Sequence, residues 1–135
     1  MRSLRYLQSS LLLLALFAVA VGFMDVLFST APLPGETGVA PTVDSNYRFF
    51  AAIFVAVGLL LLWVSLDPLE HTRGLALWWV SGAVFLGGLA RIVSLGVAGP
   101  PAPFVYALLA VELVVPPVLV LWHRALTRAS DTAAP

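Results

Sequence analysis

The sequence predicts an all-α integral membrane protein, a bundle of four transmembrane helices with both termini in the cytoplasm. Hydrophobic residues make up 61% of its 135 residues and charged residues only 10%. In soluble domains, hydrophobic residues make up about 45–50% and charged residues about 25%. The apolar residues gather in four continuous runs, each about as long as a helix that crosses a hydrocarbon core of about 30 Å. Continuous runs differ from the short alternating segments of a membrane β-barrel.

The four predicted spans cover 9–28, 47–66, 75–97 and 103–122. We expect one domain over 1–128 and a disordered tail over 129–135.

The connections between the spans fit this assignment. The Pro- and Gly-containing stretch 29–46 is a loop, and Asp44 or Ser45 is the expected cap of the second helix. Residues 67–74 form a short polar turn. In 98–102, "AGPPA", Gly99 ends one helix and the prolines begin the next.

The first run has an alternative interpretation as a cleavable signal peptide. "MRSLR" precedes "LLLLALF" and the small-residue triplet Ala18-Val19-Ala20, which is the order found in secretory signals. The apolar stretch continues to Phe28, which favours a helix that is retained. Both interpretations remain open at this stage.

Arginine placement predicts the orientation, because cytoplasmic loops are enriched in basic residues. With four spans, five arginines fall on one side, and that side also holds the four tryptophans at its predicted interface. The other side has Glu36 and Asp44, with Arg48 at its edge. These residues on the predicted cytoplasmic side are Arg2, Arg5, Arg73, Arg124 and Arg128, with Trp63, Trp78, Trp79 and Trp122.

Four ionisable residues within or at the edges of the spans form a candidate intramembrane polar cluster: Asp25, Arg48, Arg91 and Glu112. A charge at the centre of a span costs about 2.5–3.5 kcal/mol, so such groups face the protein interior and find partners. We expect Arg91 to pair with Glu112 across the hairpin of the third and fourth helices. Asp25 and Arg48 are expected to form a second pair or to extend the first into a network.

Small residues near these charges predict close helix packing. They are Ala18 and Gly22 before Asp25, Ala51, Ala52 and Gly58 after Arg48, and Gly87, Gly88 and Ser94 around Arg91. Pro116 and Pro117 follow Glu112 by one turn and are expected to kink the fourth helix there.

The cluster has two interpretations, a structural lock that fixes helix order or a site for a ligand, ion or proton. The first makes the protein a structural or accessory component of a membrane assembly, with a membrane-protein partner or a second copy. The second makes it a small-ligand or lipid binding or transport protein. Nothing in the spacing demands an enzyme, although Asp25 and Glu112 are a conceivable acid/base pair.

Several chemistries find no support in the sequence. The formal net charge is zero, which argues against nucleic acid as a partner. The absence of cysteine excludes disulfides and thiolate metal sites, and His71 and His123 have no metal-binding spacing. We therefore predict no metal and no cofactor.

Three stretches together resemble a known family: "SNYRFFAAIFVAVGLLLLW" at 45–63, "FLGGLARIVSLGVAGPPAPF" at 85–104 and "ELVVPPVLVLW" at 112–122. They are similar to the bacterial family of domain of unknown function 4345, small four-helix membrane proteins. The resemblance implies a four-span bundle in a bacterial inner membrane and carries no known activity. Its most specific elements are Asn46 with Arg48-Phe49, Arg91 with Ser94, and Glu112 with Pro116.

This chain departs from the family at one point. The family tends to have glycine soon after the Arg-Phe pair, where this chain has Ala51 and Ala52. Looser packing is expected there. The polar signature that the resemblance marks is Arg48, Arg91 and Glu112, with Asn46 and Ser94 as secondary candidates.

Overall fold

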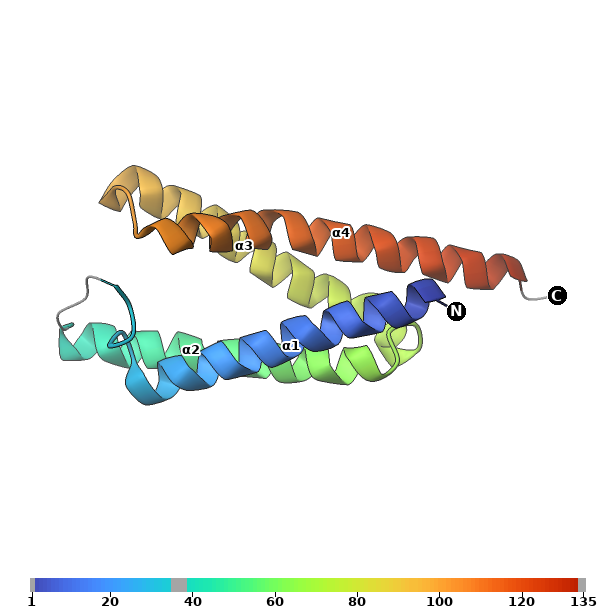
Figure 1. The fold of residues 1–135 in the computed structure, drawn as a ribbon, viewed down its shortest axis with the longest axis horizontal. Coiled ribbons are helices and arrows are strands. Elements are labelled where there is room, and N and C mark those ends of the chain that lie inside the picture. Colours follow the sequence, from blue (N-terminus) through green and yellow to red (C-terminus); the bar gives the residue numbers. More distant parts are fainter. Residues whose placement is uncertain (1, 35–38, 134–135) are drawn as a thin grey trace. The chain divides into compact units, whose positions relative to one another are not determined.

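The structure is a computed structural model that describes residues 2–34 and 39–133. Their regular secondary structure is entirely helical, with no strand among the described residues. The helices are α1 (Arg2–Phe28), α2 (Pro41–Leu66), the short 3-10 helix η1 (His71–Gly74), α3 (Leu75–Ala98) and α4 (Pro103–Ala133) (Figure 1). Each α-helix is long and apolar enough to cross a membrane. The predicted all-α class with four spans is confirmed, and the side on which the termini lie stays a prediction.

The second helix begins earlier than the sequence predicts. Its first residue is Pro41, not Tyr47, and proline suits this position because its fixed φ is helical and its missing N–H needs no partner. The backbone N–H groups of Val43 and Asp44 donate to the carbonyl of Ala40. Asp44 or Ser45 as the cap is therefore wrong. Asp44 lies in the first turn, where a carboxylate is favoured by the helix dipole.

The fourth helix continues well past its predicted apolar end. Residues 129–133, for which the sequence predicts a disordered tail, belong to α4. Within this extension the Ser130 hydroxyl shares its single proton between the carbonyls of Leu126 (3.1 Å) and Thr127 (2.8 Å). These bonds keep the polar side chain on the helix surface. The predicted tail residues 134–135, like Glu36, lie outside the described residues.

The chain divides into two compact units. One consists of Gln8–Leu66, and the other of Met1–Leu7 with Asp67–Pro135. A single domain over 1–128 stays a prediction.

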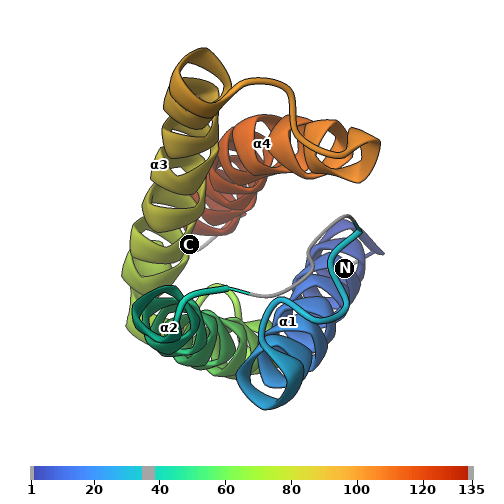
Figure 2. The same ribbon diagram turned by 90° about the vertical axis from the view of Figure 1, so that its left-hand side faces the viewer.

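In the unit of Gln8–Leu66, α1 and α2 lie side by side as a hairpin (Figure 2). Their backbones approach closely at two glycines. A Cβ on Gly58 would lie 2.8 Å from the Val19 nitrogen and 3.1 Å from the Ala15 oxygen, and one on Gly22 would lie 3.0 Å from the Ala51 oxygen. Ala51 is also buried. The looser packing expected at Ala51 is therefore wrong, because alanine fits against a glycine of the partner helix.

In the other unit, α3 and α4 form a second hairpin. Gly99, with φ +93°, follows the last residue of α3, as predicted for a helix-ending glycine. Gly88 is the point of closest approach, because a Cβ there would lie 3.2 Å from the Glu112 Cβ and 2.8 Å from Leu113 Cδ2. Gly87 has open space around it, so its predicted packing role is wrong.

A buried histidine fixes the connection that leads into α3. His123 Nε2 lies 2.8 Å from the Pro68 carbonyl oxygen, to which it donates a hydrogen bond. The same ring packs on Gly74, where an added Cβ would collide with the ring Cε1. Gly74 has φ +80°, a conformation that other L-residues rarely adopt. Residue 74 is therefore glycine for two independent reasons.

Candidate functional site

The Arg48 guanidinium caps the C-terminal end of α1 by donating hydrogen bonds to its last carbonyls. Its Nη1 donates to the carbonyl of Val26 and, at 3.1 Å, to the carbonyl of Leu27, while its Nε donates to Asp44 Oδ2 at 2.9 Å. These two carbonyls belong to the last turn of α1, whose carbonyls have no partner within the helix. A cation there is also favoured by the helix dipole.

The other two terminal carbonyls of α1 are satisfied by backbone groups. The N–H of Ser29 donates to the Asp25 carbonyl (2.9 Å), and the N–H of Ala31 donates to the Phe28 carbonyl (3.2 Å). With the two bonds from Arg48, all four carbonyls of the last turn have a donor. Arg48 thus closes a complete set of hydrogen bonds at this helix end.

Asp25 does not pair with Arg48 in the structure. Its carboxylate is hydrogen-bonded to the Tyr47 side chain, and Arg48 takes Asp44 instead. The expected Asp25–Arg48 pair is wrong. Asp44 lies one turn before Arg48 on the same helix, so the two side chains meet without any constraint from the packing of α1.

Arg91 and Glu112 form the predicted ion pair between α3 and α4. Arg91 Nε donates to Glu112 Oε2 at 2.7 Å. The Arg91 side chain is 39% exposed and the Glu112 side chain 20%. The close approach at Gly88, one turn before Arg91, brings the two helices near enough for this short bond.

The Arg91–Glu112 contact is made by one donor and one acceptor. Within the described residues, Nη1 and Nη2 of Arg91 and Oε1 of Glu112 have no hydrogen-bond partner. An arginine carries five N–H donors, so four remain. Asn46 and Ser94, the secondary candidates, are both exposed.

The sequence model of one family, Domain of unknown function (DUF4345), matches residues 6–123 of this chain. The chain belongs to the DUF4345 family. No curated protein and no solved structure matches it. Membership of DUF4345 confirms the resemblance seen in the sequence, and the match covers α2, α3 and most of α1 and α4.

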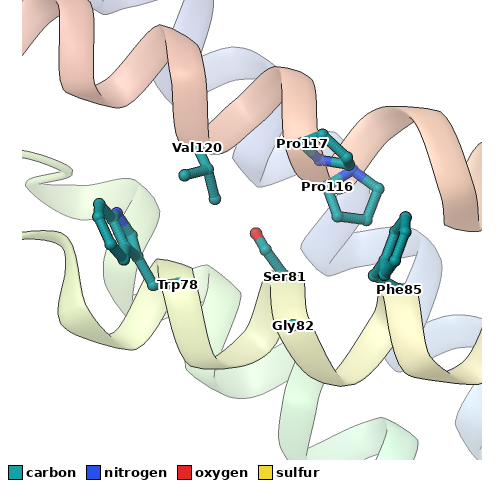
Figure 3. A pocket seen from close by; sticks show the side chains of 7 residues that line it. All are labelled: Trp78, Ser81, Gly82, Phe85, Pro116, Pro117 and Val120. Atoms are coloured by element: carbon teal, nitrogen blue, oxygen red, sulfur yellow. The ribbon is translucent and has the colours of Figure 1, made fainter.

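This DUF4345 protein also has a shallow groove between α3 and α4, of about 280 Å³ (Figure 3). Its lining is apolar except for the buried Ser81, whose hydroxyl points toward α4 (Figure 3). Both prolines of α4 line it, and they lie inside a continuous helix. The lining residues are Trp78, Ser81, Gly82, Phe85, Pro116, Pro117 and Val120.

Two further contacts in the same unit involve tryptophans. The Trp122 indole N–H donates to the Ser3 hydroxyl at 2.9 Å, and the Arg124 guanidinium lies 4.1 Å from the centre of the Trp78 ring. The sequence singles out these tryptophans for their position along the spans. It holds no signal for these partners, nor for the bond of His123 to Pro68. Among the described residues no group of three His, Cys, Asp or Glu is placed to hold a metal ion.

Proposed function

We propose that this protein is a structural or accessory component of a membrane assembly, whose intramembrane charges hold its helices together. The observation that carries the proposal is the use of Arg48. Its bonds to Val26, Leu27 and Asp44 serve the end of α1 and the start of α2, and they engage the guanidinium on two of its three nitrogens. An arginine used in this way stabilises a hairpin.

The outer surface supports a role in lateral association. Large apolar side chains remain exposed on the four helices, among them Leu13 (70%), Trp79 (72%) and Val97 (84%). Lipid, a partner helix or a second copy of the chain can cover such side chains in a membrane. We propose a membrane-protein partner or a homo-oligomer.

The experiment is a gentle isolation of the tagged full-length protein from native membranes, followed by native mass spectrometry. We expect a second protein or a second copy in constant stoichiometry. A tagged membrane protein of another family, isolated in parallel, identifies nonspecific companions. Recovery of the monomer alone in several mild detergents contradicts the accessory role.

We also propose a bacterial inner membrane location with both termini in the cytoplasm, on the arginine distribution described above. The chain has no cysteine, so single cysteines can be introduced without background. In intact cells, Ser3→Cys and Ser130→Cys are expected to resist a membrane-impermeant maleimide, whereas Ala40→Cys, at an exposed position just before α2, reacts. The unchanged chain is the control. Equal labelling at all three positions contradicts this topology.

A second candidate function is the binding of a small ligand or lipid. The observation that favours it is confined to Arg91 and Glu112, which retain unpaired donors and one unpaired acceptor among the described residues. Arg48 and Asp44 are engaged with each other, and Asp25 with Tyr47. Any such site is therefore centred on the α3–α4 pair. Its test is whether a molecule retained by the purified protein is lost when Arg91 is replaced by glutamine.

A further inference from the structure

We propose that the open side of the Arg91–Glu112 pair binds the headgroup of a phospholipid that carries a primary ammonium group. In this arrangement the lipid phosphate accepts hydrogen bonds from Nη1 and Nη2 of Arg91, and the ammonium donates to Glu112 Oε1. The proposal rests on the second candidate function above, because it names the ligand of that site.

The first argument is the set of donors that Arg91 leaves unused. Its Nε is bonded to Glu112, and its two Nη groups have no partner among the described residues. In a hydrocarbon environment each unsatisfied polar group is costly. A phosphodiester presents two anionic oxygens in the planar geometry that a guanidinium recognises with paired bonds. The two Nη groups therefore fit a phosphate.

The second argument is the free oxygen beside this cation. Glu112 uses Oε2 for Arg91, while Oε1 has no partner in the described part of the chain. An ionised carboxylate oxygen accepts hydrogen bonds and donates none. A primary ammonium donates three such bonds, whereas a quaternary ammonium such as choline donates none. The site therefore discriminates between the two amine types.

The third argument is charge balance. The Arg91–Glu112 pair is neutral as a whole, and a phosphate with an ammonium is also neutral. Binding such a headgroup brings no net charge into the span. An anionic lipid without an ammonium would place a second negative charge close to Glu112, and like charges at short distance disfavour each other.

Depth along the helices is compatible with a headgroup. Arg91 lies seven residues before the end of α3, about 10 Å, and Glu112 nine residues after the start of α4, about 14 Å. Because α3 is longer than a hydrocarbon core of about 30 Å, the Arg91 Cα lies less than about 10 Å below its edge. Arginines at such depths draw headgroups inward by local thinning of the bilayer.

Below the ion pair, the hairpin offers apolar surface to the lipid chains. Phe85 and Pro116, at the nearer end of the groove, lie six and four residues from Arg91 and Glu112, about 9 Å and 6 Å deeper. An acyl chain that descends from a phosphate at Arg91 reaches this level. The headgroup contacts carry the specificity, and the groove only has to accept hydrocarbon.

The experiment measures lipid binding to the purified full-length protein by native mass spectrometry. The protein is delipidated in mild detergent and titrated separately with phosphatidylethanolamine, phosphatidylcholine and phosphatidylglycerol of identical acyl chains. We expect the ethanolamine lipid to bind about tenfold more tightly than the choline lipid, the factor that one charge-assisted hydrogen bond supplies. Arg91→Gln is expected to weaken phosphatidylethanolamine binding by at least that factor, and Arg5→Gln, which removes an arginine elsewhere, to leave it unchanged.

A second variant keeps the test valid if Arg91→Gln does not fold. Glu112→Gln retains an oxygen that accepts from Arg91 and removes only the negative charge that the ammonium meets. We expect it to bind the ethanolamine and choline lipids equally. Persistence of the preference in Glu112→Gln, or equal binding of the three lipids to the unaltered protein, overturns the proposal.

The result also separates this proposal from the broader one. A retained non-lipid molecule that is lost in Arg91→Gln overturns the phospholipid assignment while the second candidate function stands. If nothing is retained and no lipid distinguishes the unaltered protein from Arg91→Gln, both fail.

Discussion

Exchanging the charges of Arg91 and Glu112 tests whether their contact holds α3 and α4 together. In Arg91→Glu two carboxylates face each other, and in Glu112→Arg two guanidinium groups do. Each single change removes the 2.7 Å ion pair and leaves two like charges facing each other within the helices. In Arg91→Glu with Glu112→Arg together, opposite charges face each other again. We expect the double variant to recover most of the stability that either single variant loses.

The magnitude follows from the burial of the pair. A lone charge at the centre of a span costs about 2.5–3.5 kcal/mol, and removing one partner of a fully buried pair costs about 3–5 kcal/mol. The Arg91 side chain is 39% exposed and the Glu112 side chain 20% exposed. Because the pair is not fully buried, the loss should be smaller than the loss of about 3–5 kcal/mol for a fully buried pair. We expect about 2–3 kcal/mol for each single change. If the double variant loses only about 1 kcal/mol, the coupling free energy between the two positions is about 4 kcal/mol, roughly a 1,000-fold change in the unfolding equilibrium.

The assay is the free energy of unfolding, measured for all four proteins in mixed micelles with an increasing fraction of denaturing detergent. A control cycle combines Arg91→Gln with Glu70→Gln. Glu70 lies before α3, at the opposite end from Arg91, so these two changes should add within about 0.5 kcal/mol. If the double exchange is no more stable than the weaker single variant, the two side chains do not stabilise the hairpin through their mutual attraction.

Three further predictions concern the packing of each unit and are checked by the same unfolding measurement. Gly58→Ala should destabilise the protein by about 1–3 kcal/mol, because its Cβ would lie 2.8 Å from a backbone nitrogen of α1. Gly87→Ala, with open space around it, should be neutral or stabilising by up to about 1 kcal/mol. A cost at Gly87 equal to that at Gly58 contradicts this account. Gly74→Ala should cost about 1–3 kcal/mol for its φ of +80° and more for its contact with the His123 ring. Gly82→Ala should not carry this cost, because an added Cβ there would have open space around it. If His123→Ala restores nothing to Gly74→Ala, the ring contact is irrelevant. Arg48→Gln should cost more than Asp44→Asn, by about 1 kcal/mol, because it removes the bonds to Val26 and Leu27 as well as the ion pair, and equal losses would show that the cap of α1 contributes nothing.

The sequence carries enough information for the spans because membrane thickness sets their length. Lipid imposes one simple rule on each apolar run, so α3 is predicted to within one residue. The ends that leave the lipid obey no such rule. Hydropathy ends with Trp122, but α4 continues to Ala133, because a helix can extend into water on its own hydrogen bonds.

The error at Asp25 follows from the error at the start of α2. With a helix that begins at Tyr47, Asp44 belongs to a loop and Arg48 has only Asp25 as an acidic neighbour. Once the helix begins at Pro41, Asp44 and Arg48 are one turn apart on the same face. Helix boundaries are the least certain part of a prediction from one sequence, and a shift of six residues here replaces one ion pair by another.

The pair of Arg91 and Glu112 was predictable because the hairpin constrains it. A connection of four residues joins α3 and α4, which makes them antiparallel neighbours. Arg91 and Glu112 therefore lie at similar distances from the connected ends of the two helices. No comparable pattern in the sequence predicts the hydrogen bond from His123 to the Pro68 carbonyl. A backbone carbonyl is present at every residue, so no pattern of side chains indicates which one a distant histidine will bind.

Comparison of the two arginines shows why a charge within a span does not identify its own role. Both arginines lie in helices that are long and apolar enough to cross a membrane, and both have an acidic partner. Arg48 has carbonyls of α1 within reach of its Nη1, so its hydrogen bonds are made inside the protein. Arg91 faces α4 and donates to one carboxylate oxygen there, and it does not use the carbonyls of Glu112 and Leu113, which Pro116 and Pro117 leave without an N–H donor. The difference lies in whether a helix ends beside the guanidinium. Arg48 is satisfied as a cap at a helix terminus, whereas Arg91, between two continuous helices, keeps donors that no described group accepts.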